Sequence, residues 1–309
     1  MLMAEKFETY EDRFPYESNF IEGNEPKLQV ERLGPEESAR CRLIGTGEGL
    51  DRFVHVANEY PIEEVSLILQ GISNPVRFDK LAYPERIATL RMTRTVNLDE
   101  TFDERTFQHL KLLTGLRSLE LNLVPLKVSD FPQLKQIEFL SFDAESFATA
   151  LPFENLAGLS ELRIVNFSGA LTELGSVASL KKLSLVGAKI RSLGEISELF
   201  PHLETLSIDG RGKGLELEPL SKCRNLTSLK LMGIQNPIGL EALVVPSLKQ
   251  VYIGKLDGPE FFERNKQLEW FRAKTYTGRA SAQLKSRGWA KIGKEWGTAG
   301  GFIPEELRN

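Results

Sequence analysis

The sequence predicts an α/β solenoid in which short parallel strands stack into a sheet and return segments run behind it. One phrase occurs ten times: an apolar residue, two others, an apolar residue, one other, and a third apolar residue. Successive copies begin 18 to 29 residues apart, close to the ~20–29 residue period of one repeat architecture. In each copy the last two apolar residues alternate with polar ones, as in a short strand with one buried face.

Some copies of the phrase are clearer than others. The clearest begin at Leu116, Leu180, Leu203 and Leu226; weaker ones begin at Leu134, Leu159 and Leu248, and the outermost at Ile62, Ile87 and Leu268. A strand this short cannot bury its apolar face alone, so each copy must stack on its neighbours. Parallel strands need crossover connections, which are right-handed. We therefore predict a right-handed solenoid of about ten repeats, with a curved parallel sheet on its concave face.

Over residues 62–275 the phrase resembles the leucine-rich-repeat family. That family usually places Asn or Cys three residues after the last apolar residue. Here those positions hold Gln70, Thr95, Val124, Phe142, Phe167, Ala188, Arg211 and Ile234. The asparagine ladder is therefore absent, and other groups must satisfy the turns. The resemblance implies a non-enzymatic module that binds a protein partner on its concave face.

The two ends of the chain differ from the repeats. Residues 1–38 are acidic and weakly patterned, which favours an N-terminal arm. Residues 39–61 combine an alternating segment around Cys41 and Leu43 with helical spacing, so we expect a strand–helix cap before the solenoid of residues 62–275. A further helix is expected within residues 99–113. Residues 276–309 are expected to form a basic C-terminal cap, with Trp289 and Trp296 packed on the last repeat.

Composition narrows the class of function. The formal net charge is -4, which argues against a dedicated nucleic-acid binder. The segment from Arg264 to Lys294 nevertheless carries nine basic residues and one acid, Glu269. The sequence contains no signal-like apolar segment and no apolar run long enough to cross a membrane, so we expect a cytoplasmic protein without membrane contact.

No motif predicts catalysis, a metal or a cofactor. The glycine-rich segments Gly45–Gly49 and Gly210–Gly214 follow strands, where such loops can hold phosphate, but neither has the spacing of a nucleotide loop. The histidines and the two cysteines lack partners at metal-ligand spacing; they are His55, His109, His202, Cys41 and Cys223. We expect structural roles for them and no enzymatic activity.

A candidate partner surface lies in the columns of residues beside the inward leucines. In the column after the last apolar residue, Leu140, Val165 and Val186 are consecutive apolar residues at positions expected to be exposed, and Met232 continues them after Asp209. Such a stripe is either covered by loops or the N-terminal arm, or it binds a partner.

A second group gathers near the C-terminal end of the repeats. Tyr252, Trp270 and Arg272 are of the residue types that dominate binding energy at interfaces. With Arg163 and Glu138 on the rim, they extend the apolar stripe. We expect a protein partner to span both, and a specific version is an immunity or antitoxin-type protein that masks a toxin. The alternative is nucleic-acid or acidic-surface binding through the basic C-terminal end.

Overall fold

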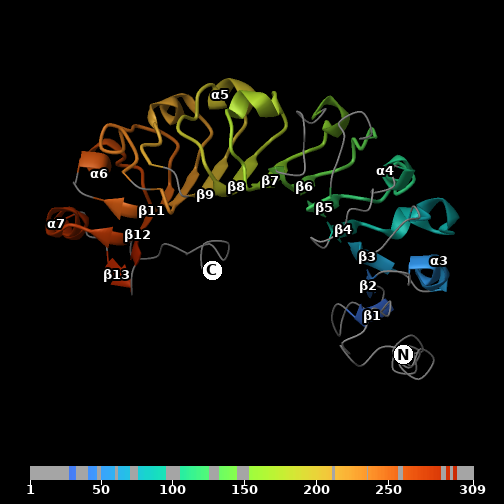
Figure 1. Ribbon diagram of the computed structural model, residues 1–309. Helices are drawn as coiled ribbons and strands as arrows, with labels where there is room; N and C mark the ends of the chain where they lie inside the picture. Colours follow the sequence, from blue (N-terminus) through green and yellow to red (C-terminus); the bar gives the residue numbers. More distant parts are fainter. Residues whose placement is uncertain are drawn as a thin grey trace. The chain divides into compact units, whose positions relative to one another are not determined.

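The structure, a computed structural model, divides into two compact units, Met1–Leu159 and Ser160–Asn309. Figure 1 labels helices and strands of each unit. Each unit is described by itself. The structure describes residues 28–32, 41–46, 50–59, 62–69, 76–94, 105–124, 132–144, 153–210, 213–234, 236–256, 260–286, 290–292 and 295–297.

Unit 1 contains a sheet of strands that follow one another in chain order. The strands are β1 (Leu28–Arg32), β2 (Cys41–Thr46), β3 (Ile62–Leu69), β4 (Thr89–Arg94), β5 (Ser118–Asn122) and β6 (Phe139–Asp143). Strands β2 to β6 pair in parallel, and β1 pairs antiparallel with β2. The helices between them are α3 (Leu50–Glu59), η2 (Phe78–Lys80), η3 (Pro84–Arg86), α4 (Arg105–Leu110) and η6 (Phe153–Leu156).

Unit 2 repeats this arrangement more regularly. Its parallel strands are β7 (Glu161–Val165), β8 (Lys182–Ala188), β9 (Thr205–Gly210), β10 (Ser228–Met232), β11 (Gln250–Leu256) and β12 (Trp270–Tyr276). The antiparallel strands β14 (Glu295–Gly297) and β13 (Ala290–Ile292) follow on β12. The helices are η7 (Leu171–Leu174), α5 (Ile196–Leu199), η8 (Glu218–Lys222), α6 (Glu260–Arg264) and α7 (Gly278–Ser286).

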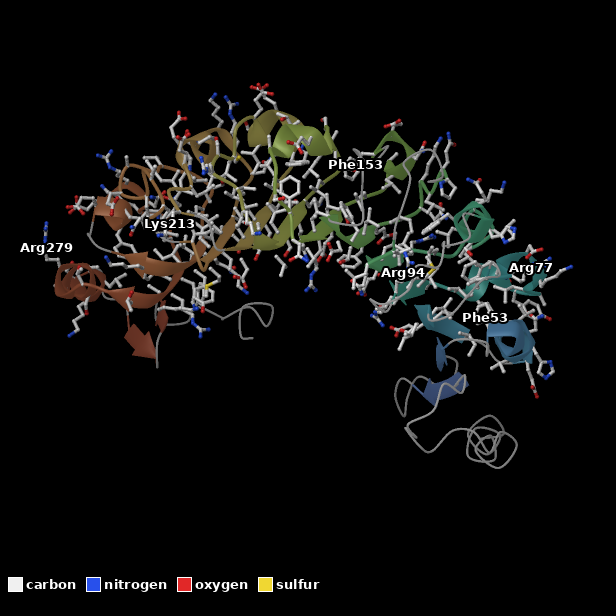
Figure 2. All side chains as sticks on the ribbon, viewed as in Figure 1. Phe53, Arg77, Arg94, Phe153, Lys213 and Arg279 are labelled. Carbon is white, nitrogen blue, oxygen red and sulfur yellow. The ribbon has the colours of Figure 1, made fainter. Side chains whose placement is uncertain are left out.

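The ten phrases coincide with the ten strands β3 to β12, so the fold is a leucine-rich-repeat solenoid, as predicted. Inward residues such as Leu183 and Leu185 are buried between sheet and return segments, where side chains fill the space (Figure 2). The return anchors expected from the sequence are also buried: Leu193, Ile196, Leu217, Leu220, Leu240 and Leu243. Leu199 is half-buried. Burying a leucine contributes about 1.5–3 kcal/mol, so stacked repeats supply the stability that one repeat lacks.

Strand β6 corrects the predicted register. Leu140 pairs with Leu119, and Phe142 with Leu121, so the phrase of this repeat begins at Ile137 rather than Leu134. Leu140 is therefore an inward residue and is fully buried. The expectation that Leu140 is exposed was wrong. The segment LKQIEFLSF fits the phrase in two frames, and the second gives intervals of 21 and 22 residues to its neighbours.

Further elements flank the repeats, and the caps expected at 39–61 and 276–309 stay predictions. Strand β2, helix α3 and strand β3 follow one another in the chain, β2 pairs in parallel with β3, and Phe53 and Val56 of α3 are buried. The pairing of β1 with β2 was not expected from the acidic N-terminal segment. Within residues 99–113 the described helix is the shorter α4. Trp296 pairs through its backbone with Phe271, whereas Trp289 lies outside the described residues.

The turns that leave the strands use left-handed backbone in place of an asparagine ladder. The residue two places after the last apolar residue has a positive φ in several repeats: 56° at Leu123, 59° at Asn166, 67° at Gly187 and 68° at Gly233. Gly233 has a second reason to be glycine, since a Cβ there would stand 2.2 Å from the carbonyl oxygen of Gly210. The next residue is apolar and buried in these repeats, as at Val124, Phe167, Ala188 and Ile234.

A polar column satisfies the turns that enter the strands. The residue before the first apolar residue of the phrase donates to a carbonyl of the preceding repeat. Gln136 donates to Leu113, Ser247 to Leu226 and Gln267 to Val245, over 3.3, 2.8 and 2.6 Å. Asn225 donates to Pro201 over 3.0 Å in the same way. These bonds tie neighbouring repeats together where the family's asparagines are missing.

One asparagine is buried within the return layer of unit 2. Asn265 is 0% exposed, and its Nδ2 donates to the carbonyls of Leu243 (2.7 Å) and Phe261 (2.9 Å). The N–H of Val245 donates to Asn265 Oδ1 over 3.0 Å. In the preceding repeats the same position, three residues before the phrase, holds apolar residues such as Cys223 and Phe200. Asn265 therefore replaces packing with three hydrogen bonds across the last repeats.

The substitution Asn265→Leu is expected to destabilise unit 2 by about 2–4 kcal/mol, because it leaves a buried N–H and two carbonyls without their side-chain partner. Urea unfolding followed by fluorescence of the three tryptophans, all at or beyond residue 270, measures it. The matched control Asn225→Leu removes one exposed hydrogen bond and is expected to cost less than about 1 kcal/mol. Equal losses in the two variants would contradict the role given to Asn265.

Candidate functional site

The open face of unit 2 is the side of its sheet turned away from the return segments. It carries the residues of β7–β12 that alternate with the inward ones. From β7 to β12 these are Glu161, Arg163, Val165, Lys182, Ser184, Val186, Thr205, Ser207, Asp209, Ser228, Lys230, Met232, Gln250, Tyr252, Gly254, Trp270, Arg272 and Lys274. Of the nine residues predicted to bind a partner, seven lie here.

The two predicted valines form an apolar pair at one end of the open face. Val165 and Val186 are register partners on β7 and β8, and both are half-buried. Asp209, the next residue of this column, is exposed on β9. Neighbouring strands lie about 4.8 Å apart, so the valines present one continuous apolar contact.

At the other end of the face, the predicted aromatic group is buried rather than accessible. Met232, Tyr252 and Trp270 are 8%, 7% and 3% exposed and pack as one cluster across β10–β12. The expectation that Met232 is exposed was wrong, and Tyr252 and Trp270, which were predicted to contact a partner, are buried as well. Long side chains on adjacent strands of one face meet each other, which alternation along a single strand does not reveal.

Two cations lie against the ring of Tyr252. The guanidinium carbon of Arg272 is 4.8 Å from the ring centroid, and the ammonium nitrogen of Lys230 is 5.8 Å from it. Such contacts stabilise by about 0.5–1 kcal/mol at exposed sites and hold the cation in place. The cluster therefore acts as a platform that positions charge, and Arg272 itself is half-buried.

The indole of Trp270 has an unusual environment. Its Nε1 is buried, with no hydrogen-bond acceptor in the part of the chain that the structure describes. Buried donors normally find a partner, because an unmet one costs about 1–3 kcal/mol.

The open face of unit 2 is positively charged. It carries five basic side chains and two acidic ones. Lys182 lies 3.6 Å from Glu161, whereas Arg163, Lys230 and Lys274 make no ion pair within 4.0 Å among the described residues. Uncompensated cations next to apolar residues are typical of a surface that meets a complementary partner.

The corresponding face of unit 1 compensates its own charge. Arg91 Nε lies 2.7 Å from Glu120 Oε1, and Arg91 NH1 lies 3.3 Å from Glu64 Oε2. Beside this triad, Asn122 donates to Thr93 Oγ1 over 3.3 Å. The register places Arg91 opposite Glu120 and Thr93 opposite Asn122, whereas Glu64 lies diagonally from Arg91, opposite Thr89. Sequence columns could have indicated the triad, since opposite charges stand in adjacent repeats.

Glu138 lies outside both open faces. With the corrected register it precedes β6, where its N–H donates to the carbonyl of Arg117. Its carboxylate is 3.6 Å from Arg117 Nε, and both side chains are exposed. The predicted central position is occupied instead by Ser141, which is 3% exposed. The placement of Glu138 on the partner surface was therefore wrong, for the same reason as that of Leu140.

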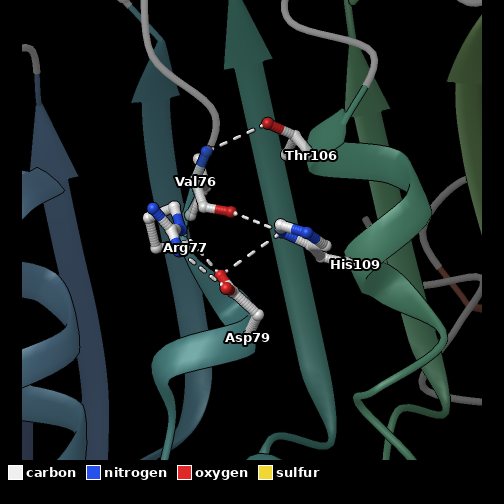
Figure 3. A network of polar contacts seen from close by, with 5 residues as sticks. All are labelled: Val76, Arg77, Asp79, Thr106 and His109. Carbon is white, nitrogen blue, oxygen red and sulfur yellow. Dashed lines mark hydrogen bonds and ion pairs between the residues drawn. The ribbon is translucent and has the colours of Figure 1, made fainter.

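A polar network ties the segment before η2 to α4 (Figure 3). The N–H of Val76 donates to Thr106 Oγ1 over 3.0 Å, and Arg77 donates twice to Asp79, over 2.8 Å each. His109 Nδ1 lies 3.4 Å from the carbonyl of Val76 and 3.6 Å from Asp79 Oδ1. Thr106 is buried, so the network fixes a return segment of unit 1, which agrees with a structural role for His109.

The remaining chemical candidates among the described residues are Cys223, His55 and His202. Burial raises the pKa of the Cys223 thiol to about 11, so at neutral pH it is protonated and a poor nucleophile. His55 and His202 are exposed. Within the described ranges no group of His, Cys, Asp and Glu could hold a metal ion. The segments Gly47–Gly49 and Arg211–Gly212, which belong to the two glycine-rich loops, lie outside the described residues.

Similarity to other proteins is confined to the fold. The sequence matches no protein-family model, and it matches no curated protein. A crystal structure of an internalin from Listeria monocytogenes is similar to 74% of this chain over 72% of its own length, with a TM-score of 0.45 and 18% identity. No helix in the described part of the chain is long and apolar enough to span a membrane.

The protonated, buried state of Cys223 predicts slow reaction with thiol reagents. In a Cys41→Ser variant, which leaves one thiol, we expect Ellman's reagent to react negligibly with the folded protein at neutral pH and completely in denaturant. Absorbance at the released thionitrobenzoate band measures both. Prompt reaction of the folded protein would mean that Cys223 is an exposed, activated thiol.

The Arg77–Asp79 pair predicts a specific pH dependence. Two hydrogen bonds from Arg77 hold the pKa of Asp79 at about 2, below its ordinary value of 3.8. A lowered folded-state pKa adds stability that is complete above about pH 4 and is lost as the pH falls toward 2. Asp79→Asn is expected to lower the melting temperature slightly at neutral pH, with a difference from wild type that disappears between pH 4 and 2.

Calorimetry of both proteins over this range tests the Asp79 prediction, with Glu85→Gln as control. Glu85 is an exposed carboxylate in the same unit. A melting-temperature difference for Asp79→Asn that stays constant down to pH 2 would contradict it.

Proposed function

We propose that this chain is a protein-binding module whose contact surface is the open face of unit 2. The observation that carries the proposal is the composition of this one face, which combines an accessible apolar pair with cations held in place. Protein interfaces are built in this way, with an apolar centre and charged or polar groups around it. The proposal keeps Arg163, Val165, Val186 and Arg272 as contact residues.

The buried cluster receives a supporting role in this proposal. Met232, Tyr252 and Trp270 form a packed platform, and Arg272 lies over the ring of Tyr252 at 4.8 Å. A side chain already held in its bound position loses little conformational entropy when a partner arrives. The residues predicted as anchors thus contribute by orienting the cations rather than by entering a partner's pocket.

Unit 1 is a weaker candidate for the contact surface. Its central arginine, Arg91, is already paired with Glu64 and Glu120, so a partner charge would have to compete with an existing triad. Exchanging one ion pair for another yields little free energy at a partly exposed site. This favours unit 2 over unit 1.

A finer version of the proposal is an immunity or antitoxin-type inhibitor that masks a toxin domain. A surface made from six strands offers a broad, rigid area, which suits the covering of a partner's active site. For this version, the activity of the purified partner is expected to fall in proportion to the amount of the chain added. An unchanged activity in the complex would leave a scaffold or adaptor role.

Nucleic-acid binding through the basic C-terminal segment has less support. Its basic residues are spread over different parts of unit 2. Arg272 lies on the open face, while Arg264 ends α6 in the return layer. Arg279 of α7 points away from the body of the unit (Figure 2) and lies 3.5 Å from Glu260. Phosphate binding requires cations gathered along one surface.

Val186→Asp is expected to weaken binding of the protein partner at least about tenfold, because it places a charge in the apolar centre of the contact. The partner is first captured on the immobilised full chain, then purified and measured by titration calorimetry. Val165→Asp is the second variant. Val244→Asp is the matched control, since Val244 is a valine of the return side that is 38% exposed.

Circular dichroism and the melting temperature establish that each variant is folded. Wild-type affinity in both Val165→Asp and Val186→Asp would reject the open face of unit 2 as the contact surface. Equal weakening by Val244→Asp would show that the effect is not specific to this face.

A further inference from the structure

We infer that the partner of the open face of unit 2 is an acidic protein segment, with carboxylates that meet the cations of the face and an aliphatic side chain that meets the valine pair. This inference rests on the proposed function and adds to it the chemical class of the partner.

The charge of the face supports an acidic partner. Arg163, Lys230 and Lys274 have no carboxylate within 4.0 Å among the residues that the structure describes. They stand on β7, β10 and β12, so positive charge extends along the whole face rather than at one end. A partner with carboxylates is attracted to such a face and one with cations is repelled.

Small hydroxyl side chains lie between these cations. Ser184 and Ser207 are register partners, and so are Thr205 and Ser228. Short side chains let the partner's backbone and carboxylates come close to the sheet, and hydroxyls donate hydrogen bonds to carboxylate oxygens. From Arg163 on β7 to Lys230 on β10 there are three strand spacings, about 14 Å, and Ser184 and Ser207 occupy the two positions between them.

The position of Arg272 fits the same partner. Contact with the Tyr252 ring, 4.8 Å away, restricts where its guanidinium can lie. Lys230 contacts the same Tyr252 ring and is a second cation. It stands on β10, about two strand spacings or about 10 Å from Arg272 on β12.

The same face is poorly suited to nucleic acid. Single-stranded binding depends on aromatic rings on which bases stack, and both aromatic side chains here are buried, to 7% and 3% exposure. The half-buried valine pair would also gain no favourable contact with a charged phosphate backbone. An acidic protein segment with an apolar residue fits both features.

The test uses a defined probe, a fluorescein-labelled helical peptide of glutamates with leucines at helical spacing. A peptide of about 20 residues is about 30 Å long, and β7–β12 span about 24 Å. Fluorescence anisotropy with the full chain is expected to show binding of this peptide and none of its lysine counterpart. Arg163→Glu and Lys230→Glu are each expected to weaken binding at least about tenfold.

Lys222→Glu is the matched control, because Lys222 is an exposed lysine of η8 on the return side; it is expected to change binding less than about twofold, as for a distant surface charge. Equal weakening by Lys222→Glu, or binding of the lysine peptide, would overturn the inference. Tighter binding of a single-stranded DNA of about 20 nucleotides would do so as well, and would assign the face to nucleic acid.

The two proposals fail in different ways. If the captured protein partner is lost with Val186→Asp but bound normally by Arg163→Glu and Lys230→Glu, the module stands and the acidic class is rejected. If all these variants bind the captured partner as wild type does, both proposals are rejected.

Discussion

The whole structure depends on the fact that one repeat cannot bury its own apolar face. Each strand offers two or three inward side chains, and these become fully buried when the strands before and after it stand in register. The core therefore forms only when the strands pair in the correct register. The register decides which residues point inward and, because side chains alternate, which ones appear on the open face. The chemistry of that face follows from the same constraint that stabilises the fold.

The turns between repeats are satisfied without the asparagine ladder of the leucine-rich-repeat family. Turns after the strands use left-handed residues such as Asn166 and Gly187, and turns before the strands use a polar column that includes Gln136 and Gln267. Both devices place the hydrogen bonds between neighbouring repeats rather than within one. The positions of the family's asparagines are then free for apolar residues such as Phe167, which enlarge the core.

Sequence reasoning predicted the fold because periodicity is a property of the whole chain, which one ambiguous repeat cannot hide. It placed Leu140 and Glu138 wrongly because a local phrase can be satisfied in two frames, and an error of frame moves residues from one face to the other. The frame that begins at Ile137 gives nearly equal intervals to its neighbouring repeats, and this frame was the correct one. The burial of Tyr252 and Trp270 was beyond this reasoning, since it arises from side chains on adjacent strands that meet one another. Opposite charges in neighbouring positions of the sequence columns, Arg91 and Glu120, would have indicated the Arg91 triad.

The open face of unit 2 therefore combines two kinds of order that the repeat makes possible. Equivalent backbone positions in successive strands are evenly spaced, so charged and hydroxyl side chains in one column stand at regular intervals. Packing across the strands then fixes the long side chains of a column, as Tyr252 does for Arg272 and Lys230. A cation held against a ring keeps its position before any partner arrives, whereas a lone surface lysine must be ordered on binding.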